Sequence, residues 1–181
     1  MWHYIKQLLQ LLLSPSAGWE DVSAAGNPPG ELQAKGYFPL VAVTALSQFL
    51  PLFYLRGLGF VRALENAVAE GVGMFVALYL ARFFLDFTLP RFIKFSYNAT
   101  KVYTFVIYLL GINCLFDILT NALPASMTFL KLLPLLAAII IYKSNKYLGI
   151  PDDEQLPFTG LAIVALIVLP IALTALLTFI I

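Results

Sequence analysis

The chain contains several apolar blocks that are each long enough to cross a lipid bilayer, separated by short polar links. A spanning helix needs about 20 mostly apolar residues to cross roughly 30 Å of hydrocarbon. Of the 181 residues, 61% are hydrophobic and 12% are charged, which is far more apolar than a soluble domain of this length requires. The sequence therefore predicts an all-α, polytopic membrane protein.

The apolar blocks predict five spans, and hence a five-helix transmembrane bundle. Their approximate ranges are 37–55, 67–87, 99–120, 128–147 and 158–181. Pro51, Pro134 and Pro170 fall inside spans, where each should kink its helix and leave a carbonyl for a neighbouring helix to satisfy. We divide the chain into an N-terminal segment, 1–36, and a transmembrane domain, 37–181.

The N-terminal stretch "MWHYIKQLLQLLL" predicts an amphipathic helix that lies in the membrane interface. On a helical wheel the polar residues His3, Lys6, Gln7 and Gln10 share one arc, and the apolar residues, Trp2 among them, fill the opposite arc. A signal peptide is the alternative, but the apolar core is short, contains Gln10 and follows a single lysine.

A second N-terminal helix is predicted to begin at Ser14 and Pro15, a cap residue followed by a residue suited to the first turn. This helix carries Trp19, a residue type that favours the membrane interface. We therefore name Trp2, Lys6 and Trp19 as candidate interfacial residues.

The lysine and arginine pattern favours a cytoplasmic N-terminus and a C-terminus on the opposite side. In that orientation seven basic residues lie inside and three lie outside. The inside residues are Lys6, Lys35, Arg91, Lys94, Lys101, Lys143 and Lys146; the outside residues are Arg56, Arg62 and Lys131.

Arg82 and Asp86 form one polar pair within a predicted span. They are four residues apart, so a helix places them side by side, and pairing reduces the cost of burying either charge. Arg82 can also extend toward the inner surface. The pair fits either a structural ion pair near that surface or a functional role.

A second polar cluster is predicted at the outer end of the bundle, where Glu70, Asn113, Asp117 and Lys131 should lie at one depth. Glu70 shares a helical stripe with small residues, which allow another helix to approach closely and place the acid against protein. The cluster fits a hydrogen-bonded packing group, or a proton-handling, ion-handling or ligand site open to the outside.

Other chemistry has little support in the sequence. HExxH, Walker, GxSxG and CxxC motifs are absent, so we predict that the protein is not an enzyme. With one histidine, His3, and one cysteine, Cys114, we expect no metal site and no cofactor. No basic patch interleaved with aromatic residues suggests nucleic-acid binding.

Three short motifs resemble the bacterial branch of the Yip family (Ypt-interacting proteins). They are Ser14, Pro15 and Trp19 in "SPSAGWEDV", Lys101 and Tyr103 at the start of the third span, and Gly149, Ile150 and Pro151 in "YLGIPDDEQLPFTG". The resemblance implies five spans and a location in the bacterial inner membrane, where the lysine and arginine bias would place the C-terminus in the periplasm. Eukaryotic members are linked to Rab-type GTPases through a long cytosolic N-terminal region that the 36 residues here do not match.

Two function classes follow as expectations. The first is a non-enzymatic scaffold or lipid-organising protein, with membrane lipids as partners and a homo-oligomer or other membrane proteins as further candidates. The alternative is a small transporter or channel with a polar cavity lined by Glu70, Asn113 and Asp117.

Overall fold

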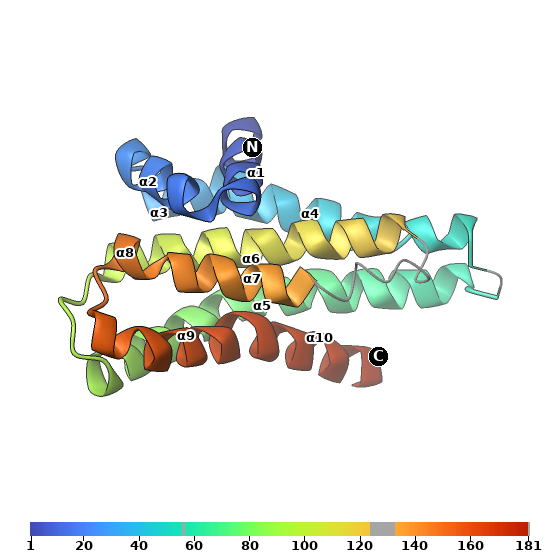
Figure 1. Ribbon diagram of the computed structural model, residues 1–181. Helices are drawn as coiled ribbons and strands as arrows, with labels where there is room; N and C mark the ends of the chain where they lie inside the picture. The colour runs from blue at the N-terminus through green and yellow to red at the C-terminus, as the bar shows by residue number, and fades with distance from the viewer. Residues whose placement is uncertain (56, 124–132, 181) are drawn as a thin grey trace.

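The computed structural model describes residues 1–55, 57–123 and 133–180, and within these ranges all regular structure is helical. The elements in chain order are α1 (Trp2–Leu13), α2 (Pro15–Ala25), α3 (Pro29–Leu32), η1 (Gln33–Tyr37), α4 (Phe38–Ser47), η2 (Leu50–Phe53), α5 (Phe60–Phe92), α6 (Ala99–Ala122), α7 (Leu133–Lys143), α8 (Asn145–Leu148), η4 (Asp152–Glu154), α9 (Gln155–Ile163), η5 (Val164–Val168) and α10 (Leu169–Ile180). The long helices lie side by side, and α1, α2 and α3 lie on one flank (Figure 1).

Among the described residues, four helical segments are long and apolar enough to cross a membrane. They are Pro29–Phe53, Phe60–Phe92, Ala99–Ala122 and Asp152–Ile180. These four segments suggest a membrane protein. They overlap the predicted spans 37–55, 67–87, 99–120 and 158–181; the first ends at Phe53, two residues before the predicted end, and the last is described up to residue 180.

Three of these segments, which start at Pro29, Phe60 and Asp152, begin well before the predicted starts at residues 37, 67 and 158. The first starts at Pro29, so the proposed boundary between residues 36 and 37 falls inside a continuous helix, within its π-helical segment η1. α5 has 33 residues and a length of about 50 Å. Hydropathy misses such helix ends because polar turns that flank an apolar block can belong to the same helix.

The fourth predicted span, 128–147, is described only in part, because its residues 128–132 lie outside the described ranges. The described part contains α7, which has 11 residues and is about 16 Å long, short of a bilayer crossing. Gly149 then ends α8 in the left-handed conformation, with φ at +74°. The count of five spans therefore stays a prediction.

Prolines coincide with the irregular turns of two spans. η5 ends two residues before Pro170, and η1 ends two residues before Pro39. Proline has no backbone N–H, so the helix must accommodate an unpaired carbonyl one turn earlier. A π-helical turn is one such adjustment, and in membrane proteins it is tolerated where another side chain satisfies the carbonyl.

α1 is fixed to the flank of the bundle by Tyr4. The Tyr4 hydroxyl donates a hydrogen bond to the Ile107 carbonyl oxygen at 2.7 Å, near the middle of α6. The side chain packs against two glycines, because a Cβ atom at Gly36 would come within 2.6 Å of the ring and one at Gly111 would clash with the hydroxyl oxygen. Leu8 is also fully buried on this face. Protein thus covers part of the apolar face that we expected to contact lipid, while Trp2, Leu9 and Leu13 of that face stay exposed.

Two details of the predicted interfacial helices need correction. Gln7, assigned to the polar arc, is buried and accepts a hydrogen bond from the Tyr108 hydroxyl. Trp19 is 2% exposed, and its indole N–H donates to the Ile140 carbonyl oxygen at 3.0 Å, so its ring contacts protein. Trp2 and Lys6 remain exposed, and their contact with lipid stays a prediction.

Candidate functional site

A cavity of about 890 Å³ opens between α5, α6, the start of α7, η5 and α10. Its polar lining comes from Arg62, Glu70, Asn113, Asp117, Thr120, Thr174 and Thr178, and its other lining residues are apolar. Three of the four residues predicted to form the outer polar cluster, Glu70, Asn113 and Asp117, therefore line one cavity. The fourth, Lys131, lies outside the described residues.

Glu70 is the most buried charged residue of the cavity, with 6% of its surface exposed. Its Oε1 atom has no hydrogen-bond partner within residues 1–55, 57–123 and 133–180. The carboxyl groups of Glu70 and Asp117 are close enough to interact directly. The cavity wall thus contains two adjacent acids, one of which has an unused oxygen.

The helix that carries Glu70 lies unusually close to α10. One turn after Glu70, a Cβ atom at Gly73 would come within 2.7 Å of the Thr174 hydroxyl oxygen. Ala77 and Ala81 continue this stripe, and both are fully buried. Small residues bring the backbones together here, and this contact positions α10 beside the buried carboxyl group.

The side-chain amide of Asn113 already forms a hydrogen bond with η5. Its Nδ2 donates to the Leu166 carbonyl oxygen at 2.6 Å. That carbonyl lies four residues before Pro170, which has no N–H to donate to it. Asn113 therefore satisfies the carbonyl that the proline leaves unpaired, and only its amide oxygen remains for a ligand.

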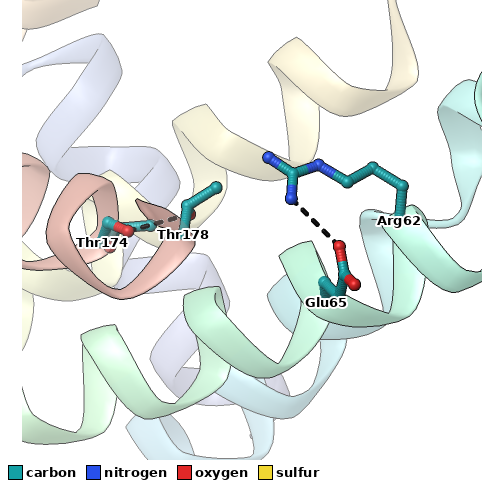
Figure 2. Close-up of polar contacts among 4 residues, drawn as sticks. All are labelled: Arg62, Glu65, Thr174 and Thr178. Carbon is teal, nitrogen blue, oxygen red and sulfur yellow. Dashed lines mark hydrogen bonds and ion pairs between the residues drawn. The ribbon is translucent and has the colours of Figure 1, made fainter. Parts of the chain in front are cut away.

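The only basic side chain among the described cavity residues is Arg62, which is paired. Its Nη1 atom lies 3.0 Å from Oε2 of Glu65, as Figure 2 shows. Across the cavity, Thr178 donates a hydrogen bond to the Thr174 carbonyl oxygen at 2.9 Å within α10. The Arg62 charge is thus balanced by Glu65, which leaves the two acids of the cavity without a cationic partner among the described residues.

Arg82 and Asp86 lie elsewhere, toward the opposite end of α5, and are not part of the cavity. Arg82 Nε lies 3.4 Å from Asp86 Oδ2. The Arg82 guanidinium also lies 4.0 Å from the centre of the Tyr103 ring, and the Tyr97 hydroxyl donates to Asp86. Burial, reinforced by that hydrogen bond, raises the pKa of Tyr97 above its usual range. The pair thus joins α5 to α6 and to the loop between them.

The threonines of α10 were missed in the sequence, although Thr174 and Thr178 stand four residues apart and so share a helix face. Arg62 and Thr120 were also not predicted to line the cavity. In the part of the chain that the structure describes, no group of three or more His, Cys, Asp or Glu residues could hold a metal ion. The expected absence of a metal and a cofactor stays a prediction.

No protein-family model, curated protein or solved structure matches this chain. The resemblance to the bacterial Yip branch therefore rests on its three short motifs. The function must be argued from the cavity and its side chains.

Proposed function

We propose that the protein is a small membrane transporter whose cavity binds a cationic solute, with Glu70 and Asp117 as the groups that hold the positive charge. The observation that carries this proposal is the buried carboxyl group of Glu70, which lines the cavity beside Asp117 with one oxygen unpaired among the described residues. Acidic residues within a spanning segment are costly and commonly mark a solute or ion pathway.

The arrangement of charges supports a cation as the ligand. Two adjacent carboxylates repel each other, and a cation or a proton placed between them removes that repulsion. Arg62 is held by Glu65 at 3.0 Å and does not supply this charge. A positively charged solute would therefore bind more favourably than a neutral or anionic one.

The size and apolar lining of the cavity support an organic cation. Its volume of about 890 Å³ lies within the range of roughly 300 to 1,000 Å³ that is typical of small-molecule sites. Met74, Phe116 and Ile171 contribute apolar surface beside the acids. A quaternary ammonium ion with short alkyl groups combines the charge and the apolar surface that this lining would accept.

The irregular segment beside the cavity supports a transport role. Ile167 of η5 and Pro170 at the start of α10 both line the cavity. Transporters commonly build their substrate sites from irregular helix segments; here the Leu166 carbonyl of η5 is satisfied by Asn113, which also lines the cavity. A π-helical turn of this kind is frequent at functional sites.

The test is uptake of radiolabelled tetraethylammonium into proteoliposomes with a negative interior potential. Glu70→Gln and Asp117→Asn keep the shape of each side chain and remove its charge. Each should reduce saturable uptake by about tenfold or more, because a contact with a charged group contributes about 1.5 kcal/mol or more.

The matched control is Glu31→Gln, which removes the charge of an exposed acid that pairs with Lys35 at 2.6 Å, away from the cavity. This variant should transport like the native protein. Equal uptake by the native protein and by both cavity variants, all monodisperse on size-exclusion chromatography, would refute the proposal.

We keep a non-enzymatic scaffold or lipid-organising role as a second proposal. It is supported by α1, where Trp2 and Leu13 are 78% and 87% exposed and are available to lipid or to another membrane protein. A scaffold predicts no solute uptake and no effect of Glu70→Gln beyond protein stability.

We further propose the finer assignments that the sequence suggests: five spans, membership of the bacterial Yip branch, and insertion in a bacterial inner membrane with a cytoplasmic N-terminus and a periplasmic C-terminus. The orientation is supported by the lysine and arginine bias. Family membership is supported by the three motifs alone. Cysteine labelling at engineered sites in the two termini would test the orientation.

A further inference from the structure

A second pocket, of about 390 Å³, lies at the other end of the bundle from the acidic cavity. It is formed by α2, the first turn of α6, the end of α7, α8 and the start of α9. In Figure 1 this is the end at which α2 and α8 lie close together. Trp19 lines the pocket, where its ring stacks on Tyr147 with 5.1 Å between ring centres.

The charge of this second pocket is positive. Lys101, Lys143 and Lys146 line it together with one acid, Glu20, so the positive charges exceed the negative charges by two. Lys146 is paired with Glu20 at 2.9 Å. Among the residues that the structure describes, Lys101 donates a hydrogen bond only to the backbone oxygen of Tyr147, at 3.3 Å. Lys143 has no carboxylate partner among the described residues. Two of the three lysine charges are therefore available to an anion.

A buried polar atom supplies an independent indication of a ligand. Asn145 also lines the pocket and is 3% exposed, and its Nδ2 donates to the Tyr142 carbonyl oxygen at 2.7 Å. Its Oδ1 atom is buried and has no hydrogen-bond partner in the described part of the chain. Buried acceptors are nearly always paired, so this oxygen suits a donor on a ligand, such as a hydroxyl or ammonium group.

We propose that this pocket binds a phosphate-bearing anion, with Lys101 and Lys143 contacting the phosphate group and Asn145 accepting a hydrogen bond from a neighbouring donor. Two sources share this chemistry, the headgroup of an anionic phospholipid and a free phosphate monoester. Basic pockets between spanning helices on the cytoplasmic side are suited to anionic lipid headgroups. The proposal does not depend on transport through the acidic cavity.

Trp19 provides a direct reporter, because the chain contains only two tryptophans and the other, Trp2, is exposed. In a Trp2→Phe background, the fluorescence of Trp19 is titrated in detergent with dioctanoyl phosphatidylglycerol, dioctanoyl phosphatidylcholine and glycerol 3-phosphate. Saturable binding of an anionic probe is expected, and phosphatidylcholine should bind more weakly.

Lys101→Gln and Lys143→Gln should each weaken this binding about fivefold, and the double variant about twenty-five-fold. Lys94→Gln is the matched control, since it removes an exposed lysine that does not line the pocket. Binding of phosphatidylglycerol alone supports the site and assigns it to lipid; binding of glycerol 3-phosphate supports the site and assigns it to a free phosphate ester. No saturable binding of either anion, or an equal loss in Lys94→Gln, would overturn the proposal.

Discussion

Replacing Gly111 with alanine should displace α1 from the bundle. The added Cβ atom would clash with the Tyr4 hydroxyl oxygen and lie 3.0 Å from the adjoining ring carbon. The ring has little room to turn aside, because it already packs so closely on Gly36 that a Cβ atom there would come within 2.6 Å of it. Tyr4 must therefore leave its site, which breaks its 2.7 Å hydrogen bond to Ile107 and exposes its buried ring.

The size of the effect follows from the burial of Tyr4. Removing a buried aromatic ring costs about 3 to 5 kcal/mol, and alanine favours a helix over glycine by about 1 kcal/mol. Gly111→Ala should thus lower the free energy of unfolding by about 2 to 4 kcal/mol. In a Tyr4→Ala background the clash is absent, so the same substitution should be close to neutral or slightly stabilising.

Equilibrium unfolding in mixed detergent micelles, followed by tryptophan fluorescence, measures all four proteins of this double-mutant cycle. Gly111→Ala is expected to lower the free energy of unfolding much more when Tyr4 is present than in the Tyr4→Ala background. If Gly111→Ala had no cost in the native chain, or the same cost after Tyr4→Ala, close packing of Tyr4 on Gly111 would be contradicted.

Two further predictions concern polar contacts. Asn113→Ala should lower the free energy of unfolding by about 1 to 3 kcal/mol, because the Leu166 carbonyl loses its donor. A Pro170→Ala background should reduce this cost by restoring a backbone N–H; an undiminished cost in the same unfolding assay would contradict the role given to Asn113. The raised pKa of Tyr97 makes its protonated form the one that favours folding, so this contribution is lost as the pH rises above about 10. Tyr97→Phe should therefore lose less stability than the native protein between pH 9 and pH 11, and identical pH profiles would count against the hydrogen bond to Asp86.

The four long apolar helices could be predicted because an apolar block of that length has few alternatives to a membrane-spanning helix. Their ends could not, since the polar turns from Pro29 to Gly36 and before Ala67 continue each helix without any apolar signal. The burial of Gln7 could not be predicted either. A helical wheel places Gln7 on the polar arc, and its hydrogen-bond partner, the Tyr108 hydroxyl, is 101 residues away in the sequence.

The acidic residues of the cavity could be recognised from depth alone, because Glu70 and Asp117 are rare charges at matching positions of two spans. Thr174 and Thr178 could not be recognised, since single hydroxyl groups scarcely change the hydropathy of an apolar run. The docking of α1 was also beyond sequence reasoning. Gly36 and Gly111 reveal close approach only when their shared neighbour, Tyr4, is known.

Equilibrium binding is the most direct test of the proposal that Glu70 and Asp117 form a cation site. Isothermal titration calorimetry with tetraethylammonium would compare the purified native protein with Glu70→Gln and with the control Glu31→Gln. We expect one saturable site in the native protein and the control, and about tenfold weaker binding or more in Glu70→Gln. Binding of equal strength in all three proteins, or no binding to the native protein, would contradict the claim.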